Sequence, residues 1–294
     1  MRKIWINRKY ILRKGSQISA YIFSIIGFIG IFAPLSDVFP KEMNVIIKIL
    51  ISGGVCACVW VITCGIIARW FNKEKMLEVF EISNDCHVYV QYGDIFSSDV
   101  IKTENKKRNI VIPVNRCFDT IVDNDLISEK TLHGIAFSKL YEAGIYDENS
   151  LNDAIQDKLA QQHIIPQDIL SEDKRAGNLK RYPVGSIAEI SISDECTYFL
   201  LGLSTFNYNL KAETSMEDYV LAMQKLIQYC CDRSQQFPVA IPLIGAGLSR
   251  ANKRERFILE FIVKLLKMNQ ELIKSDIYII VRDSGKDTIE ITDL

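Results

Sequence analysis

A glycine-rich segment at Phe237–Arg250, FPVAIPLIGAGLSR, contains the residue types that bind phosphate groups. Its first part, Val239–Ile241, is an apolar run of a length that suits a buried strand. Pro242 has no N–H with which to continue a strand ladder. Gly245 and Gly247 let the backbone approach an anion closely, because neither carries a Cβ. A strand, a glycine-rich turn and a helix in this order typically present free N–H groups to a phosphate.

The segment differs from the two best-known phosphate-binding motifs. It lacks the Gly-Lys-Ser/Thr ending of a nucleoside-triphosphate P-loop, and Arg250 replaces the third glycine of the dinucleotide fingerprint. An ordinary strand-to-helix turn is the alternative interpretation. The rest of the chain therefore has to decide what the glycines do.

Composition excludes several classes of protein. The chain has 294 residues and a net charge of −1, which argues against a basic nucleic-acid binder. Its eight cysteines contain no C-x-x-C pair, and its three histidines are isolated in sequence, so no metal site is expected. We interpret the cysteines as free thiols in a reducing compartment.

Two apolar runs near the N-terminus are long enough to cross a bilayer. Residues 18–35 and 49–68 carry no charge, and a helix needs roughly 20 residues to span the hydrocarbon core. A signal peptide is the alternative for the first run, since basic residues precede it. Against this, the run is long, a second one follows, and no small-residue cleavage site stands out. We therefore predict a two-helix transmembrane hairpin within residues 1–72.

The distribution of basic residues predicts how the hairpin is oriented. Residues 1–14 contain six Lys or Arg and no acid, whereas the loop between the runs offers little besides Lys41. The positive-inside rule then places both termini in the cytoplasm of a two-span inner-membrane protein. In the second run, Gly53, Gly54 and Ala57 form a small surface where another helix could approach closely. Their alternative role is as the ordinary glycines of a membrane helix.

The remainder of the chain alternates between strand and helix patterns. We predict a linker at 73–85, followed by an α/β domain over 86–294 with three layers, α/β/α, and a mixed sheet. Strand patterns occur at 87–91, 109–114, 182–190, 197–206, 239–241 and 276–282, and helix patterns at 128–143, 150–162, 215–233 and 253–268.

Taken in this order, residues 86–282 resemble a macro domain, the module that binds ADP-ribose and its derivatives. Val90–Ile95 (VQYGDI) is similar to the family's early strand ending in Gly-Asp-Ile. The stretch from Tyr182 to Phe206 resembles its central hairpin. The helix at Ser215–Arg233, the glycine-rich segment and the helix after it resemble its closing helix, diphosphate loop and final helix.

The resemblance implies a role for each matching residue. Asp94 would accept a hydrogen bond from the adenine amino group, and the Ile95 N–H would meet a ring nitrogen. A turn or helix cap is the alternative role of Asp94. Ligand contacts are expected at the end of the central strand and in the glycine loop: Ser204, Phe206, Asn207, Gly245, Ala246, Gly247, Leu248, Ser249 and Arg250. Arg250 has a solvated arginine at a helix start as its alternative.

The chain departs from the pattern of hydrolytic macro domains. Those domains usually carry Asn-Ala-Ala-Asn after the second strand and then a glycine triplet, whereas this chain reads Asn115-Arg116-Cys117-Phe118 with no triplet after it. Asn115 matches the first asparagine, but a phenyl ring in the place of the second cannot orient a water molecule. We therefore expect binding without catalysis, with no catalytic residue and no cofactor. Arg116, Phe118 and Arg250 are expected at the rim of the cleft.

A two-span anchor fused to such a domain resembles the membrane effectors of Thoeris anti-phage defence systems. This resemblance implies an ADP-ribose-containing signal made from NAD by a partner TIR-domain enzyme. It also implies a homo-oligomer that forms on ligand binding and acts on the lipid bilayer. A membrane-bound ADP-ribosyl hydrolase and a passive membrane-tethered scaffold are the competing hypotheses. Asn115–Phe118 favours the sensor over the hydrolase, whereas Asp94 and the glycine loop favour both over the scaffold.

Overall fold

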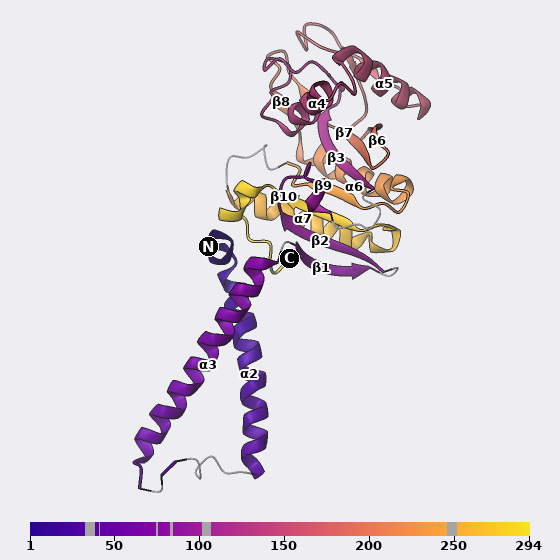
Figure 1. The fold of residues 1–294 in the computed structure, drawn as a ribbon. Helices are drawn as coiled ribbons and strands as arrows, with labels where there is room; N and C mark the ends of the chain where they lie inside the picture. The colour runs from indigo at the N-terminus through magenta and orange to yellow at the C-terminus, as the bar shows by residue number, and fades with distance from the viewer. Residues whose placement is uncertain (33–38, 41, 75, 83–84, 102–106, 246–251) are drawn as a thin grey trace. The chain divides into compact units, whose positions relative to one another are not determined.

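The computed structural model describes residues 1–32, 39–40, 42–74, 76–82, 85–101, 107–245 and 252–294. These residues form two compact units (Figure 1). The first, which we call the anchor unit, comprises Met1–Lys75 together with Lys286–Asp293. The second, which we call the α/β unit, comprises Met76–Gly285 and Leu294.

The described residues of the anchor unit form three α-helices. They are α1 (Arg2–Ile6), α2 (Arg8–Phe32) and α3 (Val45–Lys73). Helices α2 and α3 are both long and apolar enough to cross a membrane. Both extend beyond the predicted spans, because the flanking Lys and Arg are good helix formers. Residues 33–35 of the first predicted span lie outside the described residues.

Helices α2 and α3 pack against each other over part of their length. Their buried positions recur every four residues, which places them on one face of each helix: Ile11, Gly15 and Ser19 of α2 and Thr63, Ile67 and Phe71 of α3. A Cβ at Gly15 would lie 2.4 Å from Cys64 Sγ, so the glycine permits this close approach. A Cβ added at Gly53 or Gly54 would meet no described atom within 4 Å beyond its chain neighbours and the backbone of its own helix.

The α/β unit contains a mixed sheet, as predicted. The strand order is β1 (Met76–Ile82), β2 (Cys86–Tyr92), β10 (Ile277–Val281), β9 (Val239–Pro242), β3 (Arg108–Asn115), β7 (Cys196–Phe206) and β6 (Ile187–Ser193). In the described part of the chain the five central strands run parallel, and β1 and β6 flank them antiparallel. Short strand β8 (Ala212–Glu213) pairs with β7, and β4 (Gln167–Asp168) pairs with β5 (Lys180–Arg181).

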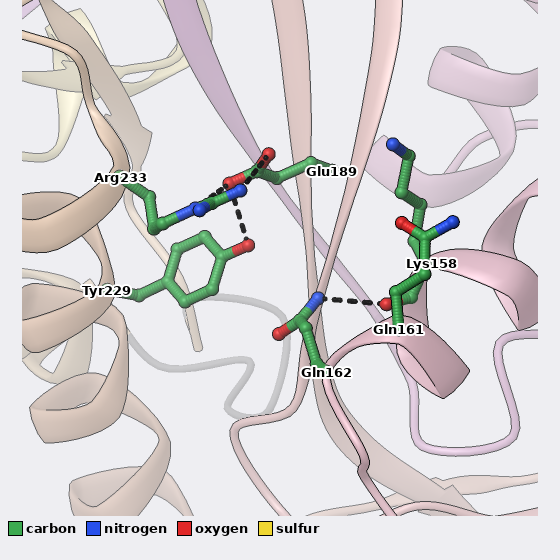
Figure 2. Close-up of a pocket in the computed structure, with 6 residues that line it drawn as sticks. All are labelled: Lys158, Gln161, Gln162, Glu189, Tyr229 and Arg233. Atoms are coloured by element: carbon green, nitrogen blue, oxygen red, sulfur yellow. Dashed lines mark hydrogen bonds and ion pairs between the residues drawn. The ribbon is translucent and has the colours of Figure 1, made fainter.

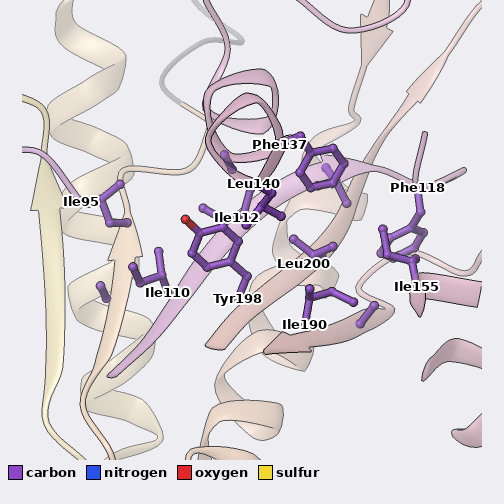
Figure 3. Packing of buried hydrophobic residues seen from close by; sticks show 14 of the residues in the cluster. Ile95, Ile110, Ile112, Phe118, Phe137, Leu140, Ile155, Ile190, Tyr198 and Leu200 are labelled. Atoms are coloured by element: carbon purple, nitrogen blue, oxygen red, sulfur yellow. The ribbon is translucent and has the colours of Figure 1, made fainter. Parts of the chain in front are cut away.

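Helices cover both faces of the sheet, which confirms the predicted three layers. Helices α4 (Leu132–Glu142) and α5 (Glu148–Gln161) bury Phe137, Leu140 and Ile155 in one cluster with Ile112 and Leu200 of the sheet (Figure 3). Side chains alternate between the two faces of a strand. Phe199, the neighbour of Leu200, accordingly packs on Tyr229 of α6 (Met216–Arg233), with ring centroids 5.5 Å apart. Helix α7 (Asn252–Met268) joins α6 through Phe261 and Tyr219.

Two predicted segments differ in the structure. Part of the expected linker, Met76–Ile82, forms the edge strand β1, because its apolar residues and its backbone ladder cover the outer edge of β2. The strand expected at 182–190 begins at Ile187, since Pro183 and Gly185 form a turn before it. Gly185 has φ +76°, a conformation that favours glycine.

Candidate functional site

The five parallel strands end at the same edge of the sheet, and most of the predicted ligand residues follow these ends. In α/β sheets, ligands bind outside the carboxyl ends of the parallel strands. These ends are Tyr92, Val281, Pro242, Asn115 and Phe206, in the order of the sheet. We call this edge of the sheet the carboxyl edge. The predicted ligand residues, which come from four distant parts of the sequence, lie at four of these five strand ends.

Asp94 lies in the turn after β2, where its side chain is exposed. Its Oδ1 accepts a hydrogen bond from the N–H of Phe96 at 3.0 Å, so the carboxylate also shapes the turn. Its Oδ2 forms no hydrogen bond among the described residues, and the role of Asp94 toward a ligand stays a prediction. The side chain of Ile95 is buried in the core, which leaves only its backbone for a ligand. Gly93 N donates to Val281 O at 2.9 Å and fixes this turn to β10.

The glycine loop begins as predicted and then leaves the described residues. Gly245 has φ +89°, and a Cβ there would lie 3.0 Å from Cε2 of Tyr219, so both conformation and space require glycine. The Tyr219 hydroxyl donates to Ile244 O at 3.0 Å and holds the loop against α6. The predicted contacts Ala246, Gly247, Leu248, Ser249 and Arg250 lie outside the described residues.

Arg116 is a half-buried cation at the carboxyl edge. Its Nε donates to Tyr182 O at 2.9 Å, and its guanidinium lies 3.8 Å from the carboxylate of Asp218 in the first turn of α6. Burial lowers the pKa of Arg116, and Asp218 opposes that shift. The same turn of α6 carries Tyr219, so one helix start positions both Arg116 and the beginning of the glycine loop. A helix N-terminus, a cation and a glycine turn together favour a bound anion.

The residues on either side of Arg116 are buried in the α/β unit. Phe118 has φ +51° and is fully buried in the core (Figure 3). Its ring packs edge-on against Tyr182, with the ring centroids 5.6 Å apart. The predicted rim position of Phe118 is therefore wrong. Asn115 is also buried, and its Oδ1 accepts from Cys117 N at 2.9 Å. Its amide favours the charged form of Asp119, so its side chain belongs to the interior of the loop.

A buried ion pair, which sequence reasoning missed, fixes this loop. The ammonium of Lys174 lies 2.8 Å from Asp119 Oδ2 and 2.9 Å from Oδ1, and the two side chains are 1% and 0% exposed. Burial raises the pKa of Asp119, and Lys174 opposes the shift. The N–H of Asn178 donates to Oδ1 at 2.6 Å. The only sequence signal was a lysine in a polar loop, which is ordinarily solvated.

The predicted residues at the end of β7 lie at the carboxyl edge but have structural contacts of their own. Ser204 accepts from Arg116 N at 2.7 Å through its carbonyl. Phe206 packs on a small cluster that includes Leu210. Asn207 shapes the turn to β8, since its Oδ1 accepts from Asn209 N and Lys211 N and its Nδ2 donates to Glu213. Their roles toward a ligand stay predictions.

A separate pocket of about 330 Å³ lies beside edge strand β6, between the last turns of α5 and α6 (Figure 2). Its centre is Glu189, which accepts from the Tyr229 hydroxyl and from two nitrogens of Arg233. Lys158, Gln161 and Gln162 complete the lining. Glu189 lies in the middle of β6, so this pocket is not part of the carboxyl edge. Within the described ranges, no group of three or more His, Cys, Asp or Glu is placed to hold a metal ion.

Comparisons with known proteins agree with this geometry. The sequence model of the family described as "Thoeris protein ThsA, Macro domain" matches residues 88–282. A curated protein named "Thoeris protein ThsA", from Bacillus amyloliquefaciens (strain Y2), is 26% identical over 169 residues. The matched region covers 57% of this chain and 51% of that relative, so the chain spans about half the relative's length.

Proposed function

Because the chain belongs to the Thoeris ThsA macro-domain family, we propose that it is a membrane-anchored effector of a Thoeris-type anti-phage defence system. In this proposal the α/β unit senses an ADP-ribose-containing signal that a TIR-domain partner makes from NAD. Ligand binding then promotes homo-oligomerisation, and the assembled spans disrupt the membrane and stop growth or kill the cell.

The observation that carries the proposal is the arrangement of Asp94, Gly245 and Arg116 along the carboxyl edge. Asp94 follows β2 and Gly245 follows β9, with only β10 between these strands. Two strand spacings amount to about 9–10 Å, which suits a nucleotide lying across the strand ends. The open carboxylate oxygen of Asp94 would accept from the adenine amine. The N–H groups of the glycine loop and the cation of Arg116 would meet the diphosphate.

The proposal includes binding without turnover. Hydrolysis needs a group that orients or activates a water molecule. The Oδ1 of Asn115 already accepts a hydrogen bond from Cys117 N, and the ring of Phe118 lies in the core. Neither side chain supports water activation in this arrangement. Incubation with an ADP-ribosylated protein and with NAD tests this point, and steady product release abolished by Asn115→Ala would favour the hydrolase.

The anchor unit supports the membrane part of the proposal. Its two candidate spans and the six basic residues among residues 1–14 support, under the positive-inside rule, an inner-membrane protein with both termini in the cytoplasm. A side chain at Gly53 or Gly54 on α3 would start in open space, since an added Cβ meets no described atom within 4 Å outside its own stretch of helix. Small residues let membrane helices approach closely, so this surface would serve contacts between copies once the α/β units cluster.

Calorimetric titration of ADP-ribose into the full-length protein in detergent tests the proposed ligand. Asp94→Ala should weaken binding by about 1–3 kcal/mol, or about 5- to 150-fold, because the adenine amine loses its acceptor. Asp99→Ala is the matched control, since Asp99 is a nearby exposed aspartate in η2 (Ser98–Val100). Binding of ADP-ribose that is equally strong in both variants would remove Asp94 from the site. Absence of binding of both ADP-ribose and its conjugates to the intact protein would refute the proposed function.

A further inference from the structure

The C-terminal residues pack in the anchor unit, not in the α/β unit. Lys286–Asp293 and Met1–Lys75 form one compact body. Ile289, Ile291 and Thr292 are buried at 0%, 2% and 0% exposure. We call residues 286–293 the C-terminal clasp. The α/β unit is therefore inserted between two parts of the anchor unit, and it is covalently joined to that unit at both of its ends.

The clasp is attached through a buried asparagine between α1 and α2. Asn7 is 0% exposed, and its Oδ1 accepts from Ile291 N at 3.0 Å and from the Thr292 hydroxyl at 3.2 Å. Its Nδ2 donates to Lys3 O at 2.9 Å. An exposed ion pair joins Arg2 to Asp287 at 2.8 Å, but solvent screens such pairs. A second ion pair joins Arg13 of α2 to Asp293. The hydrogen bonding at Asn7 differs from both pairs in being fully buried.

The end of the strand that leads into the clasp contacts the turn that carries Asp94 and the first turn of α7. Val281, the last residue of β10, accepts the hydrogen bond from Gly93 N in the turn that carries Asp94. Arg282 donates to Glu255 at 3.0 Å, and Glu255 is buried in the first turn of α7, directly after the glycine loop. The chain then passes through η5 (Asp283–Asp287) into the clasp. The Asp94 turn and the start of α7 thus converge on Val281–Arg282.

We propose that Val281–Arg282 transmits ligand binding to the C-terminal clasp, so that occupancy of the carboxyl edge stabilises the packing of the clasp on Asn7. This inference rests on the proposed function, because it takes ADP-ribose as a ligand of that edge. A ligand that restricts the Asp94 turn and the start of α7 restricts the two partners of this junction. Coupling between two sites is reciprocal. Loosening the clasp must therefore lower the affinity for the ligand by the same factor by which the ligand stabilises the clasp.

Hydrogen exchange of the full-length protein in detergent, with and without saturating ADP-ribose, measures this coupling. We expect ADP-ribose to slow exchange in peptides covering 286–293 by at least about fivefold, the lower end of typical allosteric coupling. Asn7→Ala should speed that exchange and weaken ADP-ribose by a similar factor. Gln17→Ala, which removes an exposed amide from α2, should leave both quantities unchanged.

A second variant tests the route and leaves the clasp intact. Glu255→Gln combined with Arg282→Gln removes the charged contact without leaving a buried carboxylate unpaired. It should still bind ADP-ribose, while the ligand's effect on exchange at 286–293 is lost. Binding in calorimetry together with exchange at 286–293 that is indifferent to ADP-ribose would overturn the coupling alone. Absence of any binding would overturn the proposed function and the coupling with it.

Discussion

Replacing Lys174 with methionine should destabilise the loop after β3 far more than any exposed charge nearby would. Methionine keeps an unbranched side chain of similar size but removes the ammonium from between Asp119 and Asn178 O, which lies 2.8 Å from Nζ. The Asp119 carboxylate, at 0% exposure, then keeps the N–H of Asn178 on Oδ1 and the neighbouring Asn115 amide, but no cation. Breaking a buried pair in this way costs about 3–5 kcal/mol.

The adjacent residue offers a matched control. Arg175 and Asp125 form an ion pair, and their side chains are 41% and 54% exposed, respectively. Like Lys174 and Asp119, this pair connects the loop after β3 with the loop that contains Lys174. An exposed pair contributes about 0–1 kcal/mol, so Arg175→Ala should have little effect. Lys174→Met combined with Asp119→Leu should cost clearly less than Lys174→Met alone, because no buried charge is left unpaired.

Thiol labelling provides a local assay of this stability. Cys117 is 3% exposed and lies in the affected loop, so its labelling rate follows the population of locally open molecules. At about 1.4 kcal/mol per factor of ten, Lys174→Met should speed labelling about 100- to 4,000-fold, and Arg175→Ala less than about sixfold. Cys230, 2% exposed in α6, reports opening elsewhere in the same unit. Equal effects of the two substitutions on Cys117 would refute the reasoning.

Three further predictions concern other parts of the chain. Gly245→Ala should weaken ADP-ribose at least about tenfold in calorimetry, since φ +89° is strained for alanine and its Cβ would press on Tyr219. Burial lowers the pKa of His133 to about 3, so the melting temperature should fall as pH drops below about 6.5, where the unfolded chain binds the proton first. His133→Gln should flatten this dependence, whereas His163→Asn, at an exposed position, should not. Gly54→Leu should abolish signal-dependent toxicity and leave ADP-ribose affinity unchanged, and cells that still die would refute the proposed helix contact.

The sequence alone predicted the features that depend on local patterns. Uncharged runs long enough for a bilayer predicted α2 and α3, since length and hydropathy are properties of the segment itself. Alternating strand and helix patterns predicted the three-layer unit with its mixed sheet. The order Pro242, Gly245 predicted a strand that ends in a turn, and the structure confirms both the end of β9 and the positive φ of the glycine.

Features that depend on distant partners were decided by the tertiary structure. Met76–Ile82 forms a strand because it pairs with the edge of β2. The segment's own sequence predicted a linker. Phe118 points into the core because its ring fills a space beside Tyr182 and Gly202. Both of these residues lie far along the chain from Phe118. Its position in the sequence gave no indication of which way the ring would point.

The two buried polar contacts show the physical reason for this division. Lys174 lies 55 residues from Asp119, and Asn7 lies 284 residues from Ile291. In sequence each is an ordinary polar residue that solvent would satisfy. Burial makes each one dependent on a specific partner, because an unpaired polar group inside a protein costs several times more than an exposed one. Hydropathy and spacing can be read from the sequence. The partner of a buried polar group comes next to it only when the chain has folded.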